Sequence, residues 1–315
     1  MRDWAARTVA VAGVVLAVAG CDLQYALMGF SEPKVSVASA LPVELAYREG
    51  KGGLVILTGR VNGKADVDFI LDTGAPVSVL IDGPRTVALG LDTGKARPLG
   101  DPDHPATPVG VIGRDFHVAF GPIALAGLTA IVVPEKSMPC RERFDAIGFA
   151  GVIGADLFRR FVVEIDPIAK RIRFHEPGTW RAPDGASTLP VTFGRGHPFI
   201  DARLTLASGE TIATRMNVDI GMNRALTLVA GSHPAIAMPV DGAVRKSCFV
   251  NGTREERAGP AVAVTLGNAT IPVASPVYSA SPNAVDDERR GTIGIGLFKD
   301  RRLVIDYPGR RLVVI

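Results

Sequence analysis

The chain repeats one of its own segments, and this most constrains its fold. Residues 151–158 recur as residues 291–298, with the glycines, Ile153, Leu157 and Phe158 all matched. Two short apolar runs follow each copy; they are residues 162–166 and 171–174, then 303–306 and 311–314. Self-similarity at a constant offset indicates a duplicated architecture. The sequence therefore predicts two halves of like fold, joined at residues 177–190, where Gly and Pro gather.

An acidic residue stands on a predicted turn between two apolar strands of the first half. Residues 67–71 lead into Asp72-Thr73-Gly74, and a second apolar run follows at residues 77–80. Gly74 permits backbone angles closed to other residues, and Thr73 can hydrogen-bond locally. The stretch therefore predicts a rigidly held carboxylate. The alternative is that Asp72 only forms a turn, as we expect for Asp92-Thr93-Gly94, which lacks the flanking strands.

The second half must then carry a counterpart of Asp72. Residues 199–206 and 211–218 repeat the strand pair, and the second of them ends on Asp219-Ile220-Gly221. The spacing from Asp72 to Gly154 is close to that from Asp219 to Gly294. Asp219 is therefore the predicted partner of Asp72.

The stretch Phe69–Leu80 resembles the active-site signature of the aspartic peptidases, both retropepsin-like and pepsin-like. That resemblance implies an all-β, two-lobed fold, each lobe retropepsin-like, with a cleft between the lobes. Short strands at regular spacing also favour an all-β fold. We expect an N-terminal lobe at residues 43–178 and a C-terminal lobe at residues 186–315. A flap is expected from the segment after Leu80.

Two carboxylates held close together cannot both ionise easily, so they share one proton. The resemblance implies that Asp72 and Asp219 activate a water that attacks a peptide bond, without a metal or any other cofactor. It also implies that Thr73, Gly74, Ala75 and Gly221 support the active-site loops. The expected function is that of an endopeptidase, and the expected partner is a protein or peptide substrate.

Two residues depart from the family pattern. Ile220 stands where a hydroxyl residue would lock the two loops together, and Arg224 lies close enough in sequence to hold Asp219 ionised. One alternative is therefore a protease-fold protein that binds peptide or protein without cleaving it. Another is a peptidase whose site is built from two copies of the first lobe.

The N-terminus resembles a bacterial lipoprotein signal. Basic residues precede an apolar run at residues 9–19, and small residues lead to Cys21. We expect a signal peptide at residues 1–21, a tether at residues 22–42, and a lipid on Cys21 that holds a monomer at the periplasmic side of a bacterial membrane. The alternatives are a soluble secreted protein and an uncleaved anchor.

Composition narrows the class of protein further. A hydrophobic content of 47% with 21% charged residues is that of a folded chain. The formal charge of +3 comes without a long basic run, so no nucleic-acid partner is predicted. The histidines show no metal-ligand spacing; they are His104, His117, His175, His197 and His233. Cys140 and Cys248 can pair or remain buried thiols, and both alternatives stay open.

Overall fold

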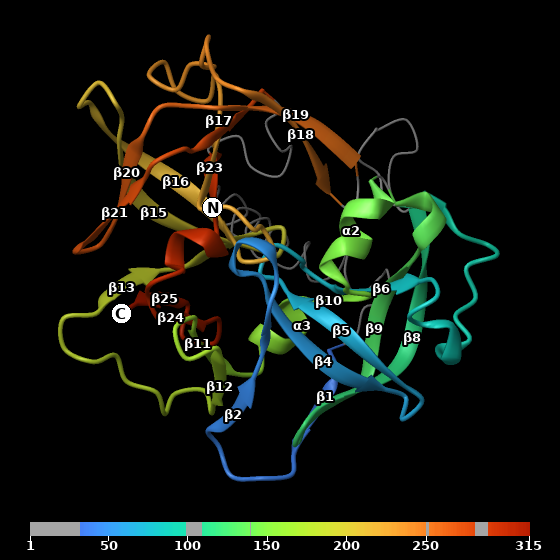
Figure 1. Cartoon of the computed structure of the whole chain (residues 1–315). Coiled ribbons are helices and arrows are strands. Elements are labelled where there is room, and N and C mark those ends of the chain that lie inside the picture. Colours follow the sequence, from blue (N-terminus) through green and yellow to red (C-terminus); the bar gives the residue numbers. More distant parts are fainter. Residues whose placement is uncertain (1–31, 99–108, 139, 250–251, 281–288) are drawn as a thin grey trace, which may run out of the picture.

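The fold is all-β, as predicted. The computed structural model describes residues 32–98, 109–138, 140–249, 252–280 and 289–315. Within these ranges the strands form three sheets, with the first half of the chain in blue to green and the second half in yellow to red (Figure 1). Among the described residues no helix is both long and apolar enough to span a membrane.

The first sheet, here called the N-terminal sheet, is built by the first half of the chain. Its described strands are β1 (Lys34–Val37), β3 (Arg48–Glu49), β4 (Val55–Val61), β5 (Ala65–Leu71), β6 (Ser78–Asp82), β7 (Arg97–Pro98), β8 (Val109–Phe120), β9 (Ile123–Pro134) and β10 (Gly151–Ile153). They lie in the order β1-β9-β6-β10-β5-β4-β8-β7, with β3 paired to β4.

The second sheet, the C-terminal sheet, is built by the second half. Its described strands are β14 (Thr192–Gly194), β15 (His197–Thr205), β16 (Thr211–Asp219), β17 (Leu226–Val229), β18 (Val244–Phe249), β19 (Gly252–Ala258), β20 (Val262–Leu266), β21 (Ala269–Val273), β22 (Val277–Ser279) and β23 (Arg289–Gly294). Their order is β18-β19-β22-β17-β23-β16-β15-β20-β21, with β14 paired to β15.

The third sheet, the bridging sheet, takes strands from both halves. These are β2 (Val43–Ala46), β11 (Val162–Asp166), β12 (Arg171–His175), β13 (Ser187–Pro190), β24 (Leu303–Asp306) and β25 (Arg311–Val314). The two repeat hairpins, β11–β12 and β24–β25, meet through antiparallel pairing of β11 with β24. The halves are therefore joined by backbone hydrogen bonds as well as by the connecting chain.

Helices are few and short in the described part of the chain. The α-helices are α2 (Arg141–Ile147) and α3 (Ala155–Phe158), and the 3₁₀ turns are η1 (Lys51–Gly53), η2 (Val87–Leu89), η3 (Glu135–Ser137) and η4 (Ile295–Phe298). α3 and η4 follow the equivalent strands β10 and β23, so each copy of the repeat turns helically at the same point.

The repeat places the two aspartates in equivalent loops. In the first half β10 pairs parallel to β5 and antiparallel to β6, and Asp72 lies on the loop between β5 and β6. In the second half β23 pairs parallel to β16 and antiparallel to β17, and Asp219 ends β16. Each aspartate is therefore fixed by a short strand wedged between the two strands that flank its loop.

A hairpin precedes Asp72. β4 and β5 pair antiparallel, and the turn between them holds Asn62 and Gly63 at φ values of 51° and 66°. Left-handed angles at both positions are those of the two-residue turn that an Asn-Gly pair favours. Phe69 of β5 packs edge-on against Phe120 in the core, with ring centroids 5.6 Å apart.

One strand carries an irregularity, and one local expectation differs from the structure. The runs at residues 109–112 and 116–120 are one strand, β8, because a register shift beside Asp115, at φ 59°, lets the chain continue past Gly113. Part of the expected tether, Lys34–Val37, is β1 and pairs with β9, so folded structure begins before residue 43. The lobe boundaries at residues 178 and 186 stay a prediction.

Candidate active site

Asp72 is held by main-chain donors on its own turn. The amide of Gly74 donates to Asp72 Oδ1 at 2.6 Å, and the amides of Ala75 and Gly221 also hydrogen-bond this carboxyl group. The amide of Asp72 donates to the carbonyl of Ile153 at 3.0 Å, which anchors the turn on β10. The predicted support from Gly74, Ala75 and Gly221 is therefore main-chain hydrogen bonding.

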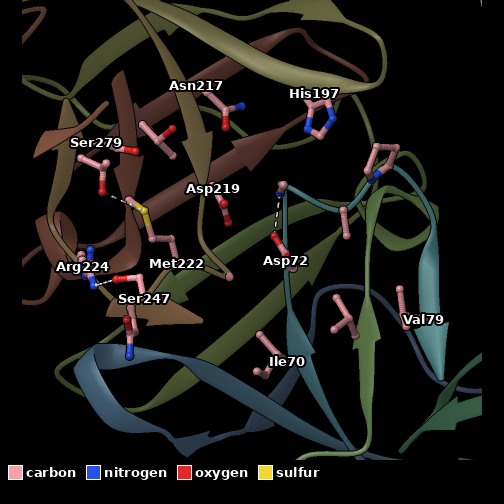
Figure 2. A pocket seen from close by; sticks show the side chains of 18 of the residues that line it. Ile70, Asp72, Val79, His197, Asn217, Asp219, Met222, Arg224, Ser247 and Ser279 are labelled. Atoms are coloured by element: carbon pink, nitrogen blue, oxygen red, sulfur yellow. Dashed lines mark hydrogen bonds between the residues drawn. The ribbon is translucent and has the colours of Figure 1, made fainter. Parts of the chain in front are cut away.

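Each carboxyl group packs against the glycine of the opposite loop. A Cβ at Gly74 would lie 2.6 Å from Asp219 Cγ, and a Cβ at Gly221 would clash with the Asp72 carboxyl group. Only glycine allows this crossed packing, which brings Asp72 and Asp219 together in one pocket (Figure 2). The structure thus unites the two predicted acids.

The two carboxyl groups form a coupled acidic pair. Burial raises the pKa of Asp72, although hydrogen bonds from Asp219 and from the main-chain amides oppose that shift. Burial, the Asp72 charge and the hydrogen bond to Asp72 together raise the pKa of Asp219 well above its usual range. Asp219 Oδ1 is buried with no hydrogen-bond partner among the described residues. The pKa values of both carboxyl groups are therefore raised, and the two groups hold one proton as a pair.

The loops are locked together from one side only. The Thr73 hydroxyl donates to the carbonyl of Val218 at 2.7 Å and accepts from the amide of Ile220 at 3.1 Å. Both Thr73 and Ile220 are buried. Because Ile220 has no hydroxyl, it makes no reciprocal bond, and the predicted departure from a symmetric lock is present.

A cavity of about 450 Å³ opens beside the two acids. Its wall in the first half is apolar and includes Ile70 and Val79, whereas Asn217 and Ser279 lie on the other side of the pair (Figure 2). The cavity volume lies within the range of small-molecule sites. Asp72 and Asp219 both line this cavity.

Residues 57–157 match the family model of aspartyl proteases. This segment is therefore similar to aspartyl protease domains. The match includes the Asp72 loop and ends before Asp219. A comparison of the whole chain with curated proteins found no match.

Tyr307 supports the Asp72 loop from the second half of the chain, and sequence reasoning missed it. Its hydroxyl donates to the carbonyl of Thr73 at 3.3 Å, and its ring is buried. Burial and the charge of Asp72 raise the pKa of Tyr307 well above its usual range, so the phenol stays protonated. The sequence held one signal for this residue. The two copies of the repeat differ at this position, where Pro167 follows Asp166 in the first copy and Tyr307 follows Asp306 in the second.

The expectation that Arg224 holds Asp219 ionised is wrong. The Arg224 guanidinium forms an ion pair with the buried Glu256 and donates to the Ser247 hydroxyl, and both partners lie on the β18–β19 hairpin. Figure 2 shows Arg224 beside Ser247. Its charge is therefore neutralised by Glu256, and the pKa of Asp219 is raised.

His197 lines the cavity, although the sequence suggested only an isolated histidine. It hydrogen-bonds the main chain of Gly74, which links the first residue of β15 to the Asp72 loop. Burial, and then the charge of Arg289, lower the pKa of His197 to about 4. The ring is therefore neutral near pH 7.

The remaining predicted residues are distributed as follows. In the described part of the chain no three His, Cys, Asp or Glu side chains gather into a metal-binding group. His175 contacts the buried Glu164 at 3.0 Å, while His104 lies outside the described residues. Cys21 also lies outside them. Cys140 is disulfide-bonded, so it is not a free buried thiol.

Asp92 forms a simple turn, as expected. The amide of Gly94 donates to Asp92 Oδ1 at 3.0 Å, and the Asp92 carboxylate stays near the surface. No strand of the described chain is wedged behind this loop. The same three letters therefore make a rigid acidic site at residue 72 and an ordinary turn at residue 92.

Proposed function

We propose that this protein is an aspartic endopeptidase that uses Asp72 and Asp219 as its catalytic pair. The observation that carries the proposal is the close pairing of the two half-buried carboxyl groups at the cavity, with the pKa of Asp219 raised well above its usual range. A pair of this kind holds one proton and one charge at the same time, which acid–base hydrolysis of an amide requires.

In the proposed reaction a water lies between the carboxyl groups and below the peptide carbonyl. Asp72 takes a proton from the water as its oxygen adds to the carbonyl carbon, and Asp219 gives its proton to the carbonyl oxygen. Proton transfer to the amide nitrogen then allows the C–N bond to break. The products are a new carboxyl group and a new amine, and the pair regains its single proton.

The one-sided lock supports a second candidate, a cleft that binds peptide without cutting it. A shift of about 1 Å in a catalytic group can reduce the rate ~100-fold, and Ile220 removes one of the bonds that would oppose such a shift. Arg224 no longer supports this candidate, because it is paired with Glu256. The pairing of Asp72 and Asp219 within one chain also disfavours a site made from two first lobes.

The test is to incubate the full chain with an unfolded protein mixture and look for fragments by mass spectrometry. Matched samples carry Asp72→Asn, Asp219→Asn or Asp92→Asn, the last a control on the surface turn. We expect fragments from the wild type and from Asp92→Asn only. Binding without any fragments would favour the second candidate, and activity that survives Asp219→Asn would favour a site built from two first lobes.

We also propose that the protein is a monomer tethered by a lipid on Cys21 to the periplasmic side of a bacterial membrane. The support is the sequence of residues 1–21. Cys21→Ser should abolish incorporation of a labelled fatty acid and move the protein from the membrane fraction to the soluble fraction. Continued labelling of this variant would refute a lipid on Cys21.

A further inference from the structure

The floor of the cavity in the first half is a row of aliphatic residues on neighbouring strands. Strand register places Ile70 of β5 beside Val152 of β10, Val152 beside Val79 of β6, and Val79 beside Ile131 of β9. All four residues line the cavity. We call them the aliphatic row. None of them offers a side-chain hydrogen bond, so this floor accepts an apolar group and disfavours a polar one.

The equivalent row in the second half is polar. Register places Asn217 of β16 beside Thr292 of β23, and Thr292 beside Thr227 of β17. These three residues line the cavity and are called the polar row. Each occupies the position that Ile70, Val152 and Val79, respectively, hold in the first half. At these three positions the two walls therefore have the same backbone pairing and opposite side-chain chemistry.

The difference continues one register step further from the acids. Val133 lies opposite Ile81 in the first half, and Ser279 lies opposite Val229 in the second. Val133 and Ser279 occupy equivalent positions, and both line the cavity. The change from aliphatic to hydroxyl side chains thus extends along the wall.

The polar row is prepared for an uncharged hydrogen-bonding group. The Asn217 amide nitrogen donates to the carbonyl of Pro198 at 3.0 Å, which orients the side chain and leaves its amide oxygen to accept from a ligand. The Thr227 hydroxyl donates to Met222 Sδ at 3.5 Å, a weak acceptor, and its oxygen can still accept a hydrogen bond. The Thr292 hydroxyl can donate or accept. The row itself has no ionisable group. Of the two arginines that line the cavity, Arg224 is paired with Glu256, and Arg289 lies near His197.

Resting on the proposed function, we propose that the cleft selects peptide bonds between a large apolar residue and an uncharged polar residue. The apolar side chain packs on the aliphatic row beside Asp72. The polar side chain, of Asn, Gln, Ser or Thr, bonds to the polar row beside Asp219. The substrate class is therefore an extended segment with an amphipathic pair at the bond that is cut.

The test uses blocked peptides that differ only in their central pair, which is Leu-Leu, Leu-Asn, Asn-Leu, Leu-Lys, Leu-Asp or Asn-Asn. Binding is measured by fluorescence anisotropy on the full chain with Asp72→Asn, and cleavage is measured on the wild type. We expect one of the Leu/Asn peptides to bind and to be cut at least about fivefold better than Leu-Leu, as one net hydrogen bond provides. Leu-Lys, Leu-Asp and Asn-Asn should be weaker than that peptide.

The variant Thr227→Val/Thr292→Val replaces two hydroxyl groups at nearly constant volume. We expect it to remove the preference for the Leu/Asn peptide and to improve Leu-Leu. Thr265→Val/Thr270→Val is the matched control, because these hydroxyl groups bond to each other on the β20–β21 hairpin, and neither residue lines the cavity. The control should keep the wild-type preference.

Two results would overturn the inference: Leu-Leu binding as well as the Leu/Asn peptides, or a preference that survives Thr227→Val/Thr292→Val. Binding that shows the preference while no peptide is cut would refute the proposed hydrolysis and support the inference. Cleavage that depends on Asp72 but favours Leu-Leu would support the proposed hydrolysis and refute the inference about selectivity. Absence of any binding would refute both.

Discussion

The Tyr307 hydroxyl donates a hydrogen bond to the main-chain carbonyl of Thr73, with 3.3 Å between the oxygens. The ring packs against Phe158 and Phe193, with centroids 5.4 Å and 4.8 Å away. A residue of the second half thus fixes the loop that carries Asp72. It does so in a protein whose Ile220 supplies no hydroxyl for the reciprocal lock, so Tyr307 is a positioning residue for Asp72.

Tyr307→Phe should lower kcat about 10-fold and leave KM unchanged, because the lost bond lets the Asp72 loop shift without altering the cavity walls. The free energy of unfolding should fall by only about 1 kcal/mol. Denaturant unfolding and steady-state kinetics on the best peptide measure the two effects. Tyr278→Phe, at a buried tyrosine of β22, is the control. Equal effects of the two substitutions would show that Tyr307 is only a core residue.

Thr73→Val should destabilise the protein by about 2–4 kcal/mol. The substitution leaves the buried Val218 carbonyl and the Ile220 amide without their partner, and each unsatisfied group costs about 1–3 kcal/mol. Thr73→Ser keeps the hydroxyl and should lie within about 1 kcal/mol of the wild type. Urea unfolding compares the two variants, and an equal loss in both would contradict a role for the hydroxyl.

Arg224→Met should destabilise the protein by about 3 kcal/mol or more, because it leaves the Glu256 carboxylate buried without its cation. The Glu256 side chain is 2% exposed and that of Arg224 is 26% exposed. Arg224→Met/Glu256→Gln should recover much of the loss. A double-mutant cycle of unfolding free energies checks this expectation, and strictly additive losses would argue against the pairing.

Asp219→Asn should abolish cleavage and raise stability relative to the wild type, increasingly so as pH rises. The pKa of Asp219 is raised in the folded protein, so the folded state holds more protons than the unfolded state above about pH 4. The wild type is therefore most stable below that pH and loses stability as the pH rises through the folded pKa. Melting temperatures of the wild type and of Asp219→Asn from pH 3 to pH 8 test the direction of this pH dependence. A difference in melting temperature that shrinks toward pH 8 would refute it.

His197→Gln should reduce the loss of stability in acid. The folded pKa of His197 is about 4, against 6.5 for an ordinary histidine, so the unfolded state binds the proton more strongly between these values. Stability that depends on neutral His197 is present above about pH 6.5 and is lost toward pH 4, by on the order of 2 kcal/mol. Unfolding at pH 7 and pH 4.5 measures the change. His233→Gln serves as the control.

Much of the fold was predictable, because the repeat and the Asp-Thr-Gly turn are local patterns with strict backbone requirements. Asp219 could be found without a matching motif, since the repeat fixed where it must lie. The partners of Arg224 could not be found in this way. Glu256 and Ser247 lie on the β18–β19 hairpin, and tertiary packing decides whether that hairpin contacts Arg224. The bond from Tyr307 and the contact of His197 with Gly74 are also contacts between the halves, which no local pattern specifies.

The bridging sheet has a consequence for the integrity of the polypeptide. β11 and β24 are held by their own ladder, and the segment 176–179 that leaves β12 is exposed. A nick in that segment would break the main chain there but leave every strand pairing in place. The two pieces would stay associated and keep both acids in register, so a single cut there is not a means of inactivation.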